Sequence, residues 1–321
     1  MTLALLSLLL LIVTIVPFKR KENQVIDFLT LIKPLILLSQ LALFTLFIFK
    51  WNTLETIEKP VFALLLIAII YHIIILSPYN RLYPKRKKKK NERASYPISL
   101  LTTAVKRSKK DKTSFTNVIK EHNPDIFLTL GSDKKWEDSF NELEKIYPHS
   151  VRVPKETRYG MHLYSKYRLD NVSINYSVYD DIPSISCTVQ LGDTLSLDLH
   201  GIRSITMNEN KRRESKEDEL LKLGKELRTS TSPTLVFSRL HKVPWSRKVI
   251  DFKKASRLID TKIGRSSATL LSHTPLNYLF HSSSIYITDV KSVKRKGLAN
   301  SPQYAKFIIE KTLNTSQYRK S

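Results

Sequence analysis

The side chains best suited to chemistry in this chain stand at the end of one apolar run. The stretch Thr234–Ser246 reads TLVFSRLHKVPWS, and its first residues have the apolar character of a buried strand. Arg239, His241 and Lys242 follow that run, and cations in such a place can bind phosphate through charge-assisted hydrogen bonds. The alternative interpretation is that they are solvated loop side chains, because basic residues occur throughout the sequence.

The overall composition limits the kinds of protein that this chain can be. Its 321 residues include 53 Lys and Arg against 29 Asp and Glu, a formal net charge of +24. Such a balance indicates an anionic neighbour, for example a lipid surface, a nucleic acid or an acidic partner. The single cysteine, Cys187, excludes an intrachain disulfide framework and a cysteine-rich metal site. The sequence has only seven glycines and contains neither a P-loop nor a G-x-G-x-x-G motif.

Three apolar runs dominate the N-terminal part of the chain. They are Thr2–Phe18, about Phe28–Phe49 and about Val61–Leu76. A helix needs roughly 20 apolar residues to cross a bilayer, with a lower limit of about 17, so we expect three transmembrane helices in a membrane domain at residues 1–80. The alternative is a cleaved signal peptide followed by a helical hairpin, but no small-residue cleavage site follows the first run. We expect His72, inside the third run, to be a packed residue and not part of a proton relay.

The basic flanks of these runs predict their orientation. Lys19–Lys21 lies between the first and second runs, and Arg81 with Lys85–Lys90 follows the third. With three spans, both flanks fall on the same side, which the positive-inside rule assigns to the cytoplasm. We therefore expect a multi-pass protein of a bacterial inner (plasma) membrane whose soluble domain is cytoplasmic. Lys85–Lys90 can also contact anionic lipid headgroups, whereas binding to nucleic acid is the disfavoured interpretation of this run.

Beyond a basic juxtamembrane linker at residues 81–95, the chain has the pattern of one α+β domain at residues 96–311, followed by a tail at residues 312–321. Short alternating strands are separated by Asp, Pro and Gly turns. We expect strands near residues 98–105, 126–130, 161–164, 172–178, 184–190, 194–200, 234–237, 278–281 and 307–310. We expect helices near residues 115–121, 136–146 and 214–228, from their apolar spacing. Several antiparallel hairpins exclude a simple parallel, doubly wound sheet.

Six pieces of the sequence, in order, resemble the endonuclease/exonuclease/phosphatase superfamily, in its bacterial subgroup with an N-terminal membrane anchor. The stretch Thr234–Ser246 resembles the family pattern of an apolar strand followed by G-D-(apolar)-N-x-x-P-W-S. The other pieces are Asn123–Ile126, Trp136, Tyr147-Pro148, Tyr159–Leu169 and the hairpin from Pro183 to His200. The resemblance covers nearly all of residues 96–311. It implies a four-layer α/β/β/α sandwich of two packed mixed sheets flanked by helices, with a Mg-dependent phosphoester-cleaving site at one end of the sheets.

The residues that the family uses to bind the metal are absent from the matching positions. The Asn that closes the first strand corresponds to Ala104, and the metal-binding Glu after the second strand corresponds to Gly131. The Asp and Asn of the central loop correspond to Arg239 and His241. Mg²⁺ prefers carboxylate and amide oxygens, so these positions predict no metal ligand. Asp133, two residues beyond the Glu position, is the one substitute ligand that we considered.

The acid–base residues of the family are absent as well. The Asp-His pair before a late strand corresponds to Asn277-Tyr278, and the terminal Ser-Asp-His corresponds to Ser301-Pro302-Gln303. An amide such as that of Gln303 does not titrate in a useful range and cannot act as a general base.

Among the polar site positions of the family, only His200 is retained. His200 and His241 could face each other across the cleft, although two histidines without a third ligand are more often loop residues than a metal site.

The resemblance thus predicts a membrane-anchored pseudoenzyme that binds a ligand or partner without cleaving it and needs no cofactor. A basic cleft of His200, Arg203, Arg239, His241 and Lys242 would bind phosphate, a lipid headgroup or a nucleic-acid end, and the partner would be an unknown protein or a phosphate-bearing ligand. One alternative is a divergent, active Mg-dependent phosphodiesterase or phosphatase with relocated ligands. Another is an interaction or inhibitor subunit of a membrane complex, in which the cleft has no role.

Overall fold

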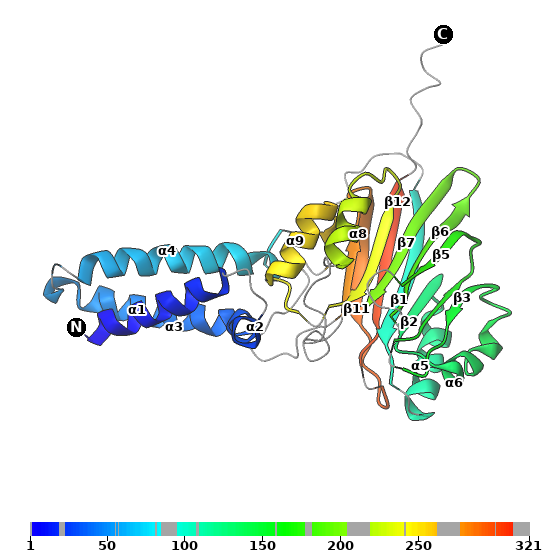
Figure 1. Cartoon of the computed structure of the whole chain (residues 1–321), viewed down its shortest axis with the longest axis horizontal. Coiled ribbons are helices and arrows are strands. Elements are labelled where there is room, and N and C mark those ends of the chain that lie inside the picture. Colours follow the sequence, from blue (N-terminus) through cyan, green and yellow to red (C-terminus); the bar gives the residue numbers. More distant parts are fainter. Residues whose placement is uncertain are drawn as a thin grey trace, which may run out of the picture. The chain divides into compact units, whose positions relative to one another are not determined.

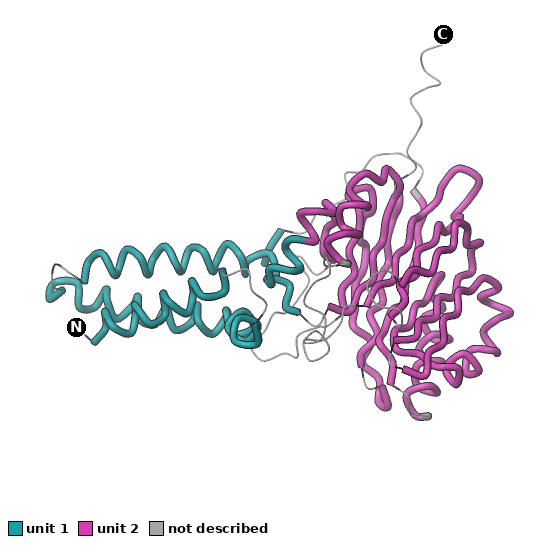
Figure 2. Tube along the Cα trace, viewed as in Figure 1, with its two compact units in different colours: residues 1–85, 242–251, 262–276 teal, residues 86–241, 252–261, 277–321 magenta. Residues whose placement is uncertain are grey.

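The chain divides into two compact units, which we describe separately. The computed structural model describes residues 2–18, 23–54, 56, 58–80, 82–84, 95–106, 109–157, 159–176, 182–203, 219–240, 242–261, 277–298 and 300–310. The helical unit comprises residues 1–85 with two later segments, 242–251 and 262–276. The sandwich unit comprises residues 86–241, 252–261 and 277–321 (Figure 2).

The described residues of the helical unit up to Tyr79 form four α-helices and short 3-10 turns. The α-helices are α1 (Thr2–Ile15), α2 (Gln24–Leu31), α3 (Lys33–Phe49) and α4 (Glu58–Leu76). The 3-10 turns η1 (Val16–Phe18), η2 (Trp51–Thr53) and η3 (Ser77–Tyr79) follow α1, α3 and α4. Helices α1, α3 and α4 pack against one another along their lengths (Figure 1).

The middle apolar run, expected as one helix, is broken into two. Helices α2 and α3 meet at Ile32 with a bend of 59°. The cause is Pro34, in the first turn of α3, because proline has no N–H to continue the hydrogen bonding of the preceding helix. By length and composition, Glu58–Tyr79 is the one described helix that can cross a membrane by itself. The bent pair would make a second span, and Thr2–Phe18 is shorter, so three spans are not shown.

The first sheet of the sandwich has six strands in the order β11-β12-β1-β2-β4-β3. These are β1 (Ser95–Ala104), β2 (Ile126–Leu130), β3 (His149–Val153), β4 (Met161–Ser165), β11 (Ile285–Ser292) and β12 (Gln303–Glu310). Only β1 and β2 pair in parallel. The sequence did not predict β3 or β11, which form the two edges of this sheet.

The second sheet has six strands in the order β5-β6-β7-β8-β10-β9. These are β5 (Leu169–Asn175), β6 (Ser184–Gly192), β7 (Leu195–Arg203), β8 (Thr234–Arg239), β9 (Ile259–Asp260) and β10 (Asn277–His281). Strands β7 and β8 are parallel, and the other pairs are antiparallel. Both sheets are therefore mixed, as the resemblance implied.

Alternate residues of the two sheets form one apolar core between them. It includes Leu100 and Leu128 of the first sheet and Leu199, Phe237 and Leu279 of the second. Such an apolar–polar alternation turns one face of each strand toward the facing sheet.

Helices cover the outer faces of the sandwich, as Figure 1 shows. Helix α5 (Lys109–His122), helix α6 (Lys134–Asp138) and turn η4 (Asn141–Leu143) pack on the first sheet through aromatic residues such as Phe115 and Trp136. Helix α9 (Arg247–Ser256) brings Phe252 within 4.9 Å of the Phe280 ring on the second sheet. Helix α8 (Glu219–Leu227) packs on α9, because Gly224 lies against Phe252 and Ala255. The α/β/β/α sandwich is confirmed. The helix expected at residues 136–146 is instead the short α6 followed by η4.

Candidate functional site

The family positions predicted from sequence gather where the strands of both sheets end or begin. Strands β1 and β2 run in parallel to Ala104 and Leu130, and β12 starts beside them because Gln303 pairs with Thr102. In the second sheet, β7 and β8 end together at Arg203 and Arg239, and β10 starts at Asn277 opposite Arg239. We call this set the strand-end site. Its members are Ala104, Gly131, Arg203, Arg239, Asn277 and Gln303.

Contacts between the sheets show that these ends belong to the same end of the sandwich. A Cβ placed on Gly201, two residues before Arg203, would lie 2.9 Å from the Leu128 side chain of the first sheet. The Arg203 guanidinium lies 5.1 Å from the centre of the Tyr159 ring. Tyr159 precedes Gly160, whose carbonyl accepts a 2.7 Å hydrogen bond from the Gly131 N–H.

The first sheet contributes backbone geometry and small side chains to the strand-end site. Ala104 is buried, and its carbonyl accepts a 2.7 Å hydrogen bond from the Asn300 amide. Gly131 has a φ of +88°, a left-handed conformation that glycine adopts without strain. Gly160 allows a close approach, because a Cβ there would lie 1.9 Å from the Ser132 carbonyl. This half of the site therefore offers no ligand side chain at the Asn and Glu positions of the family.

The second sheet contributes two cations on the face turned to the first sheet. Arg203 and Arg239 are register partners on parallel strands, and each continues the face that carries the core leucine or phenylalanine of its strand. Arg203 is buried, and burial lowers the pKa of Arg239 from its ordinary value. Asn277 continues the face of Leu279, whereas Tyr278 points to the opposite face and stacks on Phe280 at 5.5 Å. Tyr278 is therefore a packing residue of the outer layer.

The profile of the Endonuclease/Exonuclease/phosphatase family matches residues 100–238. Residues 100–238 of this chain are therefore similar to that family. No curated protein matches the sequence.

Solved structures share the fold of this family domain at low sequence identity. The human Nocturnin catalytic domain with bound sulfate anion is 15% identical, with a TM-score of 0.50 over 67% of this chain and 97% of that chain. The endonuclease/exonuclease/phosphatase from Bacteroides vulgatus is 11% identical, with a TM-score of 0.52 over 67% and 100% of the two chains. ANGEL2, a 2',3'-cyclic phosphatase, in complex with adenosine-2',3'-vanadate is 11% identical, with a TM-score of 0.53 over 69% and 100%. These likenesses establish the fold alone.

The donor set of the strand-end site does not fit the metal on which the family relies. A divalent cation needs oxygen ligands, preferably carboxylates, but the matching positions hold a methyl group, a bare glycine and a guanidinium. Within the described ranges, no group of three or more His, Cys, Asp or Glu side chains could hold a metal ion. Asp133, the substitute that we considered, is the N-cap of α6, and its Oδ1 accepts a 3.1 Å hydrogen bond from the Trp136 N–H. This carboxylate therefore has a structural role in the fold.

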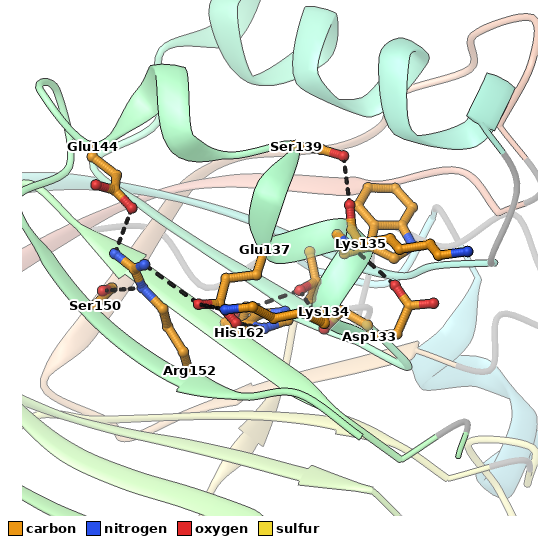
Figure 3. A network of polar contacts seen from close by, with 12 residues as sticks. Asp133, Lys134, Lys135, Glu137, Ser139, Glu144, Ser150, Arg152 and His162 are labelled. Atoms are coloured by element: carbon orange, nitrogen blue, oxygen red, sulfur yellow. Dashed lines mark hydrogen bonds and ion pairs between the residues drawn. The ribbon is translucent and has the colours of Figure 1, made fainter. Parts of the chain in front are cut away.

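An acid–base network that the sequence did not predict lies on the outer face of the first sheet (Figure 3). Glu137 of α6 lies 2.9 Å from the Lys134 Nζ, 3.6 Å from Arg152 and 3.8 Å from the His162 Nε2. Arg152 also pairs with Glu144 at 2.8 Å. The contacts join α6 and the turn after it to β3 and β4.

Burial and charge shift the pKa values in this network. The pKa of His162 is lowered to about 4, mainly by burial and also by the charges of Arg152 and Lys134, although the Glu137 carboxylate opposes the shift. Burial favours a raised pKa for Glu137, but the Lys134 hydrogen bond and the neighbouring cations outweigh it, so the pKa is lowered. Because His162 shares its face with Tyr164, which packs under α5 and α6, the network is on the opposite side of the sheet from the strand-end site. We interpret it as structural, since it fixes α6 on the sheet.

The remaining members of the predicted basic cleft are not brought together. His200 lies on the outer face of the second sheet, where its Nδ1 is 2.8 Å from the Ser186 Oγ. The expectation that it lines the cleft is wrong, because strand alternation turns Leu199, and not His200, toward the first sheet. His241 lies outside the described residues. Lys242 belongs to the helical unit, where its Nζ lies 2.7 Å from both carboxylate oxygens of Asp27.

The Pro-Trp-Ser part of the opening motif also belongs to the helical unit. Trp245 is buried, and its indole N–H donates a 2.7 Å hydrogen bond to the Thr30 carbonyl of α2. Trp245 and Val243 form an apolar cluster with Tyr79. The motif is thus divided, with Thr234–Arg239 in the sandwich unit and Val243–Ser246 in the helical unit.

Proposed function

We propose that this protein is a membrane-anchored member of the family that binds a phosphate-bearing ligand or partner without hydrolysing it. One observation carries the proposal. At the end of the two sheets, the positions that would hold a metal and its acid–base residues are occupied by Ala104, Gly131, Arg239, Asn277 and Gln303. The arrangement thus keeps the scaffold and replaces the anionic donors by neutral groups and one cation.

Electrostatics makes a metal at this site unfavourable. Two unit charges 4 Å apart interact by about 4 kcal/mol at an effective dielectric constant of 20. A divalent ion at that distance from the Arg239 guanidinium would therefore be destabilised by about 8 kcal/mol, with no carboxylate at the matched positions to offset the repulsion. Ordinary millimolar metal binding does not survive a penalty of this size.

The same features favour an anion. Arg203 and Arg239 are neighbours on one face, and guanidinium groups bind phosphate oxygens in a bidentate geometry. The Thr102 Oγ1 and the Gln303 Oε1, paired in register beside them, have no hydrogen-bond partner among the described residues. Buried polar atoms are normally paired. The Thr102 hydroxyl can donate to a phosphate oxygen, whereas the Gln303 Oε1 only accepts and would pair with a water or a protonated ligand oxygen.

Titration and hydrolysis assays on the full chain in detergent test this proposal. We expect inorganic phosphate to bind and Mg²⁺ and Mn²⁺ to give no binding heat by calorimetry. We also expect no metal-dependent hydrolysis of p-nitrophenyl phosphate or its diester. Metal-dependent hydrolysis whose rate changes in either direction in Arg239→Ala would overturn the proposal, whereas hydrolysis unchanged in that variant would come from a contaminant. Rebuilding the family residues with Gly131→Glu, Arg239→Asp, His241→Asn, Pro302→Asp and Gln303→His should restore metal binding before turnover.

The distribution of side chains in the helical unit supports a membrane location. Large apolar residues face outward, including Leu9, Ile12, Ile67 and Ile74, each more than half exposed. Polar residues face inward, and three of them form a hydrogen-bonded chain across α1, α3 and α4. The His72 Nδ1 lies 2.9 Å from the Gln40 Oε1, and the Gln40 Nε2 donates to the Thr14 Oγ1 at 3.0 Å. Interior polar pairing under an apolar exterior is the arrangement that a lipid environment favours.

We further propose three spans with the sandwich unit in the cytoplasm of a bacterial cell. The basic flanks at Lys19–Lys21 and Lys85–Lys90 support this orientation. A reporter fused to the C-terminus should be active only if it works in the cytoplasm, and an N-terminal cysteine tag should react with an impermeant reagent added outside. Strong alkaline phosphatase activity from the C-terminal fusion would reverse the orientation.

A further inference from the structure

The segment Lys242–Arg247 contacts helix α2 and the 3-10 turns that follow α1 and α4. Lys242 pairs with Asp27 of α2, and Trp245 donates to the Thr30 carbonyl of α2. The Tyr79 hydroxyl of η3, after α4, donates a 3.2 Å hydrogen bond to the Pro244 carbonyl. Arg247 donates at 3.3 Å to the Phe18 carbonyl of η1, after α1. All these contacts lie within the helical unit and join residues that are 165 or more positions apart in sequence.

The hydrogen bond from Trp245 pairs the Thr30 carbonyl, which Pro34 leaves without a helical donor. In a continuous helix the Thr30 carbonyl would accept a hydrogen bond from the residue four positions later, which is Pro34. Proline has no N–H, so the carbonyl is left without its helical donor at the bend between α2 and α3. A neighbouring donor has to pair such a group when it is away from water. The buried indole N–H of Trp245 supplies that donor.

An ion pair and an apolar cluster also join this segment to the N-terminal helices. The side chain of Lys242 is 13% exposed and that of Asp27 is 34% exposed, so the ion pair is largely shielded from solvent. The rings of Tyr79 and Trp245 lie 5.9 Å apart at 60°, and Ile75 and Leu76 of α4 pack against them. An ion pair, a capped carbonyl and an apolar cluster therefore converge on six consecutive residues.

We propose that Lys242–Arg247 is a docking segment that binds the N-terminal helices and fastens them to the loop after β8. This role is independent of the proposed function, because the docking residues are not members of the strand-end site. In the family pattern this loop combines catalytic residues with Pro-Trp-Ser. In this chain the catalytic positions have changed, and the Pro-Trp-Ser positions serve attachment. The surface that this segment binds lies on the N-terminal helices and consists of the Asp27 carboxylate, the Thr30 carbonyl and the Tyr79 ring. Its occupant is Lys242–Arg247 of the same chain.

Proximity can be tested by cross-linking in native membranes. In a Cys187→Ser background, the pair Asp27→Cys with Lys242→Cys should react with a short bismaleimide. The matched control pair is Asn52→Cys with Lys242→Cys, because Asn52 lies in η2 beyond the 17-residue helix α3, about 25 Å along its axis from Lys33. Equal cross-linking of the two pairs, or none of the first pair, would overturn the docking role.

The individual contacts can be tested without removing the segment. Asp27→Asn and Trp245→Phe should each raise the rate of tryptic cleavage after Lys242 and Arg247 in the full chain about tenfold. The phenylalanine keeps the aromatic ring and loses only the indole N–H. Trp51→Phe, at an exposed tryptophan of the same unit, should leave the rate unchanged. The double charge reversal Asp27→Lys with Lys242→Asp should restore protection at Arg247, which is the site of the two that this variant keeps. Equal rates of cleavage after Arg247 in all these variants would contradict the proposal.

Discussion

The two units of this chain differ in how many of their large apolar side chains are exposed. In the sandwich unit the core between the sheets is apolar, and the large apolar side chains recorded as exposed are limited to Ile146, Val172, Ile174 and Tyr176 among its described residues. In the helical unit the large apolar residues are mostly outside, and Ser7, Thr14, Gln40 and His72 are inside. The hydrophobic effect organises a fold only where water is the solvent. This contrast is what we expect if the helical unit lies in the proposed membrane and the sandwich unit in water.

The largest effect should come from truncating the aromatic core of the sandwich unit. Phe127 is fully buried and contacts the rings of Phe140, Tyr147 and Tyr164. Phe127→Ala should lower the free energy of unfolding by about 3–5 kcal/mol, through lost transfer energy and a cavity. Ile67→Ala, at a 61% exposed position of α4, should have almost no effect in detergent. Chemical denaturation of both variants measures the difference, and similar losses would remove the contrast between the units.

The free energy of unfolding should also depend on pH, by a smaller amount, because the sandwich unit buries the titratable side chain of His162. The pKa of His162 is about 4 in the folded chain because of burial, whereas an unfolded histidine titrates near 6.5. The unfolded state therefore binds the proton first, and stability should fall as the pH drops from about 6.5 toward 4, by about 3 kcal/mol. Denaturation at several pH values should show this slope reduced in His162→Gln. His149→Gln on β3 is the matched variant, and equal slopes in the two would contradict the assignment.

At the strand-end site the backbone, and not a side chain, should be the sensitive element. Gly131→Ala should destabilise the fold by about 1–2 kcal/mol, because its φ of +88° is unfavourable for any residue with a Cβ. Gly192→Ala on β6 is the control, since nothing lies within 4 Å of a Cβ there. Thermal unfolding distinguishes the two. A neutral Gly131→Ala would mean that a Glu could return to this position without strain.

The smallest effect should come from the polar interior of the helical unit. Gln40→Ala removes the hydrogen bonds to both Thr14 and His72. Interhelical hydrogen bonds in membranes contribute about 0.6 kcal/mol on average, so the loss should be about 1 kcal/mol. Ser39→Ala, an exposed neighbour that bonds only to the Leu35 carbonyl, should be neutral. Unfolding in mixed detergent micelles provides the measurement, and a stabilising Gln40→Ala would show that the interior has no preference for polar pairing.

The sequence predicted the parts of the fold that have strong local patterns. Alternation and turn residues identified nine strands close to their observed positions, and the resemblance supplied the packing of two sheets. Strands β3, β9 and β11 were missed, and all three are edge strands. Strand β9 has only two residues, and β3 and β11 carry exposed residues such as Arg152 and Asp289. The expected helix at residues 136–146 was too long, because apolar spacings of three and four residues also fit a short α-helix followed by 3-10 turns.

The sequence predicted the strand ends at which the candidate site lies, but not all of the residues that belong to it. The strand ends converge as the resemblance implied, because parallel strands bring their carboxyl ends to one edge of a sheet. His200 was expected on the face of β7 that is turned to the first sheet. That face carries its neighbour Leu199, so the His200 side chain points to the outer face. The ion pair between Lys242 and Asp27 was not foreseeable, since no local pattern links residues 215 positions apart.

The carbonyl of Thr30 also sets an order of events during synthesis. Its donor, Trp245, is made 215 residues later. At about 5–20 residues per second, this delay is roughly 10–40 s. Helices α1 to α4 are complete long before the donor exists, so the bend at Pro34 must first be satisfied by water or by another transient partner. The Trp245 indole replaces that partner late in folding. It can do so only after strands β1 to β8 have been synthesised.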